Sequence, residues 1–162
     1  MKQLAVVVLL ALELAVLGCG SSTPTNTAPT AASGTWQAVL VGGSGEASTL
    51  NFVTTFSVNG DSSLDVTGIQ FITVGPCFGA GSTAGGSLSV SNSTGVVTGP
   101  FSFSVQSGTG NTLTLAGTEN GTVITGTWTL NGSGGCDDSD STTQPSRTFT
   151  MCQGSGPCKS TA

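Results

Sequence analysis

Short runs in which apolar side chains alternate with hydroxyl-bearing ones fill most of this chain from residue 34 onward. In the run 96–106, for example, Phe101, Phe103 and Val105 fall on one side of an extended backbone. A period of two residues is typical of a β-strand with one buried face. Helices are disfavoured because 25 glycines, 22 serines and 26 threonines displace the strong helix formers. The pattern therefore predicts an all-β domain.

Eight such runs follow one another with mostly short connections. Two connections contain an Asn-Gly pair, Asn59-Gly60 and Asn120-Gly121, which signals a hairpin because both residue types tolerate positive φ. Residues 92–95 form a further predicted turn. We therefore expect an antiparallel up-and-down meander of about eight strands, arranged as a closed barrel or as a two-sheet sandwich. The predicted strands span 34–41, 48–58, 63–74, 86–91, 96–106, 112–118, 123–130 and 147–152.

A short pattern recurs three times within the predicted strands, as Val66-Thr67-Gly68, Val97-Thr98-Gly99 and Ile124-Thr125-Gly126. Glycine inside a strand permits a sharp bend or a bulge, and a small barrel needs such bends to close. The alternative is coincidence, since threonine and glycine are abundant throughout the chain.

The first 18 residues have the features of an export signal. Met1-Lys2-Gln3 carries a positive charge, and residues 4–12 are uniformly apolar. Glu13 interrupts the apolar stretch, which then resumes over residues 14–18. The stretch is too short and too interrupted for a spanning helix, which needs about 20 apolar residues. It fits a secretory signal peptide.

The end of this signal resembles a known class. Val16-Leu17-Gly18-Cys19 is similar to the lipobox of bacterial lipoproteins, although the first residue of that motif is usually leucine. The resemblance implies cleavage before Cys19, which then carries acyl chains as the new N-terminus. It also implies an address in the cell envelope, at the outer membrane, with the lipid bilayer as a partner. The alternative is an ordinary signal peptide in which Cys19 is incidental.

Residues 19–33 contain no large apolar side chain and predict a flexible tether between the lipid and the domain. Each buried methylene of an acyl chain contributes about 0.8 kcal/mol, so several chains suffice for anchoring. The predicted organisation is a signal peptide over 1–18, a lipidated tether over 19–33, a β-domain over 34–152 and a tail over 153–162.

Two similar segments occur near the ends of the β-domain, Ser33-Gly34-Thr35-Trp36 and Thr125-Gly126-Thr127-Trp128. They resemble the Gly-x-Trp motif of avidin-like and lipocalin-like barrels, the calycins, whose tryptophan packs across the barrel floor. The resemblance implies an architecture and carries over no binding residue. The alternative is that Trp36 and Trp128 are plain core residues.

An exported protein meets an oxidising compartment, where disulfides form. Besides Cys19, four cysteines remain, and they allow three pairings between which the sequence does not choose. We favour Cys77–Cys136, which would join two long loops, and Cys152–Cys158, which would close a short one. A metal or redox site is the alternative, but the chain has no histidine and no Cys-x-x-Cys motif.

Charge restricts the partners and the chemistry. The chain has three Lys and Arg residues, eight Asp and Glu residues and no histidine, for a net charge of −5. A nucleic-acid binder needs a basic surface, so nucleic acid is excluded as a partner. Catalytic triads and metal sites that use histidine are also excluded. We expect no cofactor.

Carboxylates supply two candidate sites. The segment 137–141, Asp-Asp-Ser-Asp-Ser, offers oxygen ligands for calcium but misses the EF-hand spacing, so a solvated acidic loop is favoured. Asp61 and Asp65 flank a predicted hairpin, and their spacing of four places both on one face, which we expect to be the solvent face. Without a base beside a nucleophile, no catalytic residue is predicted and the chain is not expected to be an enzyme.

Two functions of different kinds follow. The first is a membrane-anchored envelope lipoprotein that acts as a passive or adhesive surface β-module and meets an envelope macromolecule. The alternative is a calycin-like carrier that holds a small apolar ligand inside the barrel. They differ in whether inward side chains fill the interior, because a ligand pocket needs about 300 Å³ or more. The oligomeric state stays open.

Overall fold

The computed structural model describes residues 32–42, 50–72, 77–79, 81–89, 91–93, 96–133, 136, 147–154 and 158. Within these ranges every regular element is a strand. The strands are β1 (Gly34–Val41), β2 (Phe52–Val58), β3 (Leu64–Phe71), β4 (Thr83–Leu88), β5 (Ser91–Ser93), β6 (Val96–Gln106), β7 (Thr112–Asn120), β8 (Val123–Asn131) and β9 (Thr148–Gln153).

The first and last strands pair and turn the meander into a nearly closed barrel. The spatial order is β3-β2-β1-β9-β8-β7-β6-β4, with every pairing antiparallel and with the short β5 beside β6. β1 pairs with β9 from Trp36↔Gln153 to Val41↔Thr148. The predicted all-β meander is confirmed, and the architecture is a nearly closed eight-strand barrel, consistent with a calycin-like barrel.

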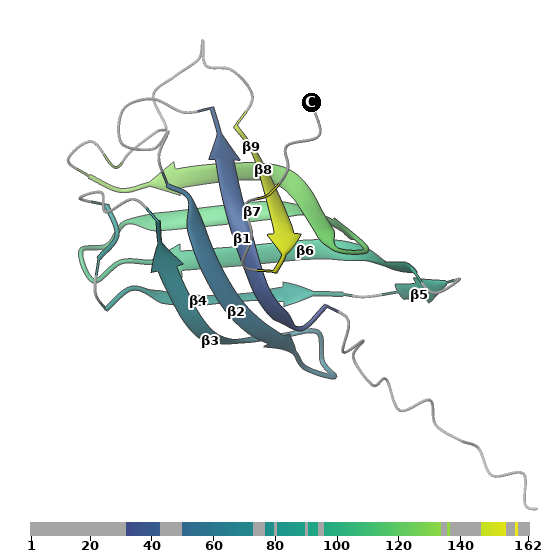
Figure 1. Cartoon of the computed structure of the whole chain (residues 1–162). Helices are drawn as coiled ribbons and strands as arrows, with labels where there is room; N and C mark the ends of the chain where they lie inside the picture. The colour runs from purple at the N-terminus through teal and green to yellow at the C-terminus, as the bar shows by residue number, and fades with distance from the viewer. Residues whose placement is uncertain are drawn as a thin grey trace, which may run out of the picture.

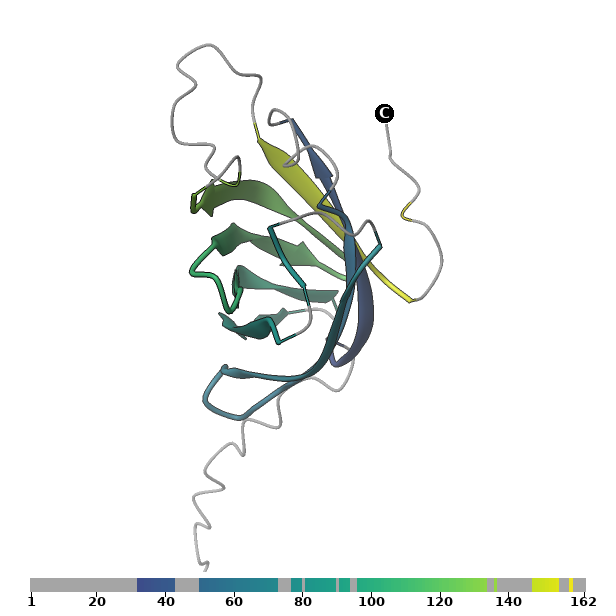
Figure 2. The same cartoon turned by 90° about the vertical axis from the view of Figure 1, so that its left-hand side faces the viewer.

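Figures 1 and 2 show how the barrel is flattened. One wall consists of β1, β2, β3 and β9, and the other consists of β4, β6, β7 and β8. The strands of the two walls cross steeply, as in orthogonally packed sheets. Their inward side chains therefore meet in one shared core.

Several element boundaries differ from the prediction. β4 spans Thr83–Leu88, so it begins and ends three residues before the predicted strand 86–91. Residues 92 and 93, predicted as part of a turn, belong to the strand β5, which pairs with β6. β7 continues through Asn120, past its predicted end at 118, because the β7–β8 loop contains just Gly121 and Thr122. Gly121 has a φ of 67° there, which suits a two-residue hairpin.

The hairpin predicted at Asn59-Gly60 is present, but its geometry differs. The Ser62 amide donates to the Asn59 carbonyl (2.9 Å), and the Asn59 amide donates to the Ser63 carbonyl (2.9 Å). Positive φ falls on Ser62, at 70°, which is uncommon for a residue other than glycine. The turn is therefore longer than the two residues that an Asn-Gly signal favours.

Aromatic side chains from opposite walls meet inside the barrel. Phe52 of β2 stacks on Phe103 of β6 with ring centroids 5.8 Å apart. Phe101 lies 6.2 Å from Phe149 of β9. The buried apolar side chains on the strands are Trp36, Ala38, Leu40, Phe52, Phe56, Val58, Leu64, Leu88, Phe101, Phe103, Val105, Leu113, Leu115, Ile124, Trp128, Leu130, Phe149 and Met151.

Two facing glycines make room for one of these rings. Gly117 of β7 pairs with Gly126 of β8, and a Cβ at Gly117 would lie 2.9 Å from Cζ of Phe149. A Cβ at Gly126 would collide with the backbone of Ala116. In the recurring Val/Ile-Thr-Gly pattern, Gly126 therefore allows β8 to pack closely against the backbone of β7. Gly68 instead follows a register shift in the β2–β3 ladder, which is a bulge as the pattern predicts.

Both favoured disulfides are present. Cys77 is bonded to Cys136 and Cys152 to Cys158, each with a Cα–Cα distance of 5.4 Å. The sequence separations are 59 and 6 residues. Loop-closure entropy then contributes about 4 kcal/mol for the first bond and about 2 kcal/mol for the second.

The described part of the barrel includes the last two residues of the predicted tether, Ala32 and Ser33. Ala32 is buried, and its carbonyl accepts a hydrogen bond from the indole N–H of Trp36 (2.9 Å). The Ser33 Oγ accepts a hydrogen bond from the Val58 amide (3.1 Å). The predicted signal peptide and residues 19–31 lie outside the described residues.

We predict that Gly126→Ala lowers the free energy of unfolding by about 1–3 kcal/mol, because the added methyl group overpacks a backbone contact. Gly108→Ala is the matched control, since a Cβ at Gly108 would meet nothing within 4 Å. Urea unfolding followed by tryptophan fluorescence measures both. Equal midpoints for the two variants would contradict the close packing of Gly126.

Candidate functional site

β3 and β4 are neighbours in the barrel but do not form a continuous ladder. Within the described residues their pairing consists of one bridge, Ser63↔Ser87, and a hydrogen bond from the Leu88 amide to the Ser62 carbonyl (2.8 Å). The two strands separate beyond this contact. We call the resulting opening the seam cleft. It is bounded by residues 66–71 of β3 on one side and by residues 78, 79 and 81–84 on the other.

Two adjoining hollows make up the seam cleft. The first has a volume of about 380 Å³, and the second has a volume of about 290 Å³. Both are lined by Ile69 and Ser82, so the hollows lie next to each other. The first hollow extends from there toward Val66 and Ala84, and the second toward Phe71 and Phe78.

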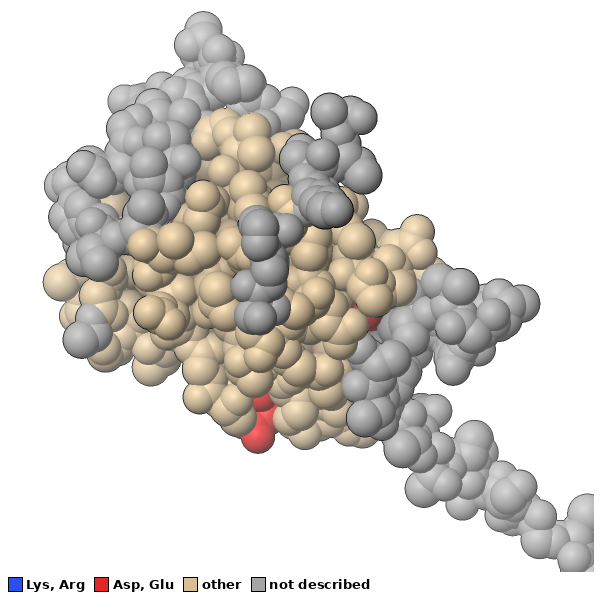
Figure 3. All heavy atoms as spheres, viewed as in Figure 1, with Lys and Arg blue, Asp and Glu red and all other residues tan. Residues whose placement is uncertain are grey.

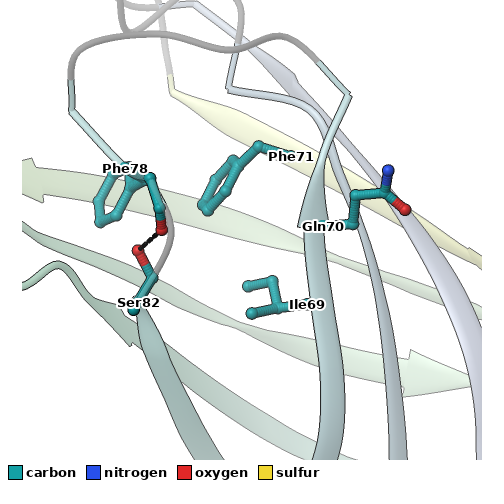
Figure 4. A pocket seen from close by; sticks show the side chains of 7 residues that line it. Ile69, Gln70, Phe71, Phe78 and Ser82 are labelled. Carbon is teal, nitrogen blue, oxygen red and sulfur yellow. Dashed lines mark hydrogen bonds between the residues drawn. The ribbon is translucent and has the colours of Figure 1, made fainter.

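The walls of the second hollow are apolar on the inside and polar at the rim. Figure 4 shows Ile69 and Phe71 pointing into it from β3 and Phe78 facing them from the opposite side, while Gln70 points away. Phe71 and Phe78 are stacked with centroids 5.0 Å apart. The Ser82 hydroxyl donates to the Gly79 carbonyl (2.9 Å). The cleft can therefore hold an uncharged group against aromatic and aliphatic side chains.

The centre of the barrel has a different character. Phe52 touches Phe103 across it, and Phe71 lies 5.6 Å from Phe52, so the seam cleft opens directly above the aromatic core. The carrier hypothesis places a ligand inside the barrel. The cross-wall aromatic contacts occupy that position, and the hollows lie at the seam instead.

A carboxyl group is buried on the inner face of β7. Leu113, Leu115, Gly117 and Glu119 alternate inward, and Glu119 pairs with Gly99 on one side and with Ile124 on the other. Glu119 has 0% of its surface exposed, and neither carboxyl oxygen has a hydrogen-bond partner. An unpaired carboxylate in such surroundings is costly. Burial therefore raises the pKa of Glu119 from 4.5 to about 7.

Among the described residues, no group of three or more ligating side chains is placed to hold a metal ion. Asp61 and Asp65 are both exposed, as predicted. The Ser63 hydroxyl (2.6 Å) and amide (3.0 Å) donate to Asp61, and these hydrogen bonds lower its pKa. Asp61 therefore stabilises the hairpin turn.

The described residues contain no helix that is long and apolar enough to cross a bilayer.

The remaining predicted residues are distributed as follows. Trp36 and Trp128 are both buried core residues, and the indole N–H of Trp128 donates to the Val41 carbonyl (3.1 Å). The Arg147 guanidinium lies 5.8 Å from the ring centroid of Trp128. Cys19 and the acidic segment 137–141 lie outside the described residues. The four paired cysteines are structural.

Comparison of the chain with protein-family models, curated proteins and solved structures gives no match.

Sequence reasoning missed both Glu119 and the seam cleft. Glu119 was assigned to a hairpin turn, although extending the alternation from Leu113 by steps of two would have placed it inward. For the seam cleft, no sequence signal shows which neighbouring strands fail to pair.

We predict that the free energy of unfolding falls by about 3 kcal/mol as the pH rises from about 4.5 to about 7. The folded protein binds the Glu119 proton more tightly than the unfolded chain does, so folding is favoured below this window and loses that contribution across it. Chemical denaturation at pH 4.5, 6, 7 and 8 measures the effect. The chain has no histidine that would titrate in this window.

Glu119→Gln is the control, because it removes the titrating group and keeps its shape. We expect this variant to have nearly constant stability across the same pH values. A wild-type protein as insensitive to pH as the variant would mean that Glu119 is solvated.

Proposed function

We propose that this chain is a membrane-anchored envelope lipoprotein whose barrel acts as a passive or adhesive surface module. The observation that carries the proposal is an outer surface with almost no charge. Within the described residues the ionisable side chains are Asp61, Asp65, Glu119 and Arg147, and Glu119 is buried. In the view of Figure 3, acidic atoms surface in small spots and uncharged atoms form nearly all of the described face.

Hydroxyl groups dominate the outward side of β6, β7 and β8. They lie in register across the strands, for example Thr118 beside Thr125 and Thr114 between Ser104 and Thr129. Regular hydroxyl rows offer donors and acceptors to a neutral partner without a charge to desolvate. We name this surface the hydroxyl face; it consists of Ser102, Ser104, Thr114, Thr118, Thr125, Thr127 and Thr129.

Anchoring follows from the lipobox-like segment 16–19 and the polar tether behind it. An acidic chain of net charge −5 gains nothing from anionic lipid, so acyl chains at Cys19 must supply the attachment. The first described residue, Ala32, is thirteen positions beyond Cys19, which leaves a spacer between bilayer and barrel.

Carriage of a small apolar ligand is the second candidate function. The specific observation in its favour is the seam cleft, whose hollows of about 290 and 380 Å³ fall in the size range of ligand pockets. The aromatic contacts across the barrel oppose a ligand at the centre, so the ligand of such a carrier would occupy the seam.

We predict that Cys19→Ala moves the protein from the membrane fraction to the soluble fraction. The acyl chains attach to that thiol and to the new N-terminus, and no other attachment is expected. Fractionation of cells followed by immunoblotting measures the distribution, and mass spectrometry of the wild-type N-terminus reports the acyl mass. Cys19→Ser removes the same thiol and serves as a second variant. Unchanged membrane association of both variants would contradict lipid anchoring.

We predict that lysines on the hydroxyl face abolish adhesion. Thr118 and Thr125 are exposed and lie opposite one another, so Thr118→Lys with Thr125→Lys places two charges in the row of the face next to the β7–β8 hairpin. Aggregation of cells that display the protein should fall to the level of cells without it. Asn59→Lys with Gly108→Lys adds the same charge outside the face and should leave aggregation unchanged. Equal aggregation of cells with the wild-type protein and with each double variant would contradict adhesion through the hydroxyl face and leave the passive role.

A further inference from the structure

We propose that the seam cleft binds an extended, uncharged peptide segment, which adds as a further strand to the edge of β3 that has no strand partner among the described residues. The proposal concerns a site away from the hydroxyl face, and it does not depend on lipid anchoring. It rests on three features of the cleft: unpaired strand edges, exposed glycine backbone and an apolar floor.

The edges of the cleft are competent for pairing. β3 pairs with β2 along its whole length, from Val58↔Leu64 to Phe52↔Phe71. In an antiparallel ladder, alternate residues direct their N–H and C=O groups away from the partner strand, and along residues 66–71 these groups face the cleft. Proteins usually block such an edge with lysine, with proline or with a β-bulge. β3 and β4 contain neither lysine nor proline, and their one charged residue, Asp65, lies near the closed end. The bulge of β3 lies between Val66 and Gly68, so residues 68–71 keep a regular register with β2 and form the part of the edge that can pair.

Glycines leave the backbone of the cleft uncovered. A Cβ at Gly68, Gly79 or Gly81 would meet nothing within 4 Å. Gly68 belongs to β3, and the other two lie on the opposite side of the cleft. Glycine in a strand often marks a place where another backbone approaches closely. The cleft is therefore open to a main chain on both sides.

The floor of the cleft is apolar. Val66, Ile69 and Phe71 are partly exposed there and pack against the core. None of the described residues that line the two hollows is charged, which favours an uncharged occupant. Side chains two residues apart on one strand are about 6.6–6.8 Å apart. A peptide with alternating apolar residues can therefore direct them into the two hollows and keep its polar residues outside.

A peptide matches the cleft better than an acyl chain does. An acyl chain would cover the apolar floor but offers no hydrogen bonds to the edges. An extended peptide satisfies both parts of the site, as in the addition of a strand to an exposed sheet edge.

The test uses the purified full chain and two fluorescent probes. The first probe is a capped peptide of seven residues in which valine and threonine alternate, and the second is a labelled dodecanoate. We expect saturable binding of the peptide by fluorescence polarisation. The same peptide with alternate amide nitrogens methylated should bind at least about tenfold more weakly, because it loses its main-chain donors.

Variants of the protein locate the site. Gly68→Lys adds a long charged side chain at the edge of β3, and Thr83→Lys does so at β4, where Thr83 is exposed and lines the first hollow. Each should weaken peptide binding about tenfold or more. Gly108→Lys makes the same change in a distant turn with equal free space and should leave binding unchanged. Circular dichroism confirms that each variant is folded, and two edge variants protect the test against the failure of one.

Three results would overturn the proposal. The first is the absence of saturable peptide binding, and the second is equal binding of the methylated peptide. The third is saturable binding of dodecanoate that Gly68→Lys weakens while the peptide does not bind, which would assign the cleft to an apolar ligand. Hydrogen exchange adds an independent readout, since a bound strand should slow the exchange of amides within residues 66–71.

Discussion

The ladder between β1 and β9 is the interaction on which the structure depends. It joins the two ends of the ordered chain, from Trp36↔Gln153 to Val41↔Thr148. Because it is continuous, neither the first nor the last strand has a free edge. The incomplete pairing of the barrel falls instead between β3 and β4, in the middle of the sequence. The position of the seam cleft is thus a consequence of where the chain closes.

Closure also determines what the interior must contain. Two walls that cross steeply leave a narrow space, and aromatic rings from both walls occupy it. Gly117 lacks a side chain where the ring of Phe149 lies, and Gly126 lacks one where the backbone of Ala116 lies. The same interior contains the carboxyl group of Glu119, whose strand neighbour is Gly99. The large rings, the glycines and the buried acid therefore belong to one tightly packed interior.

The fold was predictable from the sequence because a strand with one buried face shows a two-residue alternation of inward-facing and outward-facing side chains. Leu50, Phe52, Thr54 and Phe56 alternate in the sequence, and all four are buried. The two disulfides were favoured on loop arguments, Cys77–Cys136 because it joins two long loops and Cys152–Cys158 because it closes a short one, although the sequence alone left three pairings open. The strand period needs only local information, whereas the bond between Cys77 and Cys136 joins residues 59 positions apart.

The candidate site depends on information that is not local. Ile69 and Ser82 line the same hollow, yet nothing in either segment shows that their strands separate. The Asn59-Gly60 signal predicted a hairpin correctly but misplaced the left-handed residue, because the loop has three residues and such loops place the left-handed residue last, here Ser62. Glu119 was misassigned because a charged residue beside Asn-Gly is usually part of a turn, and the tertiary register overrode that preference.

The contact at Ser62, Ser63, Ser87 and Leu88 has a mechanical consequence. All other neighbours around the circle are joined by ladders of several residue pairs, whereas this junction has a single bridge and an adjoining hydrogen bond among the described residues. Parting it would convert a tube into a curved, open sheet while leaving the remaining ladders whole. The least costly large-scale fluctuation of this barrel is therefore an unzipping along one line, with both disulfides still in place.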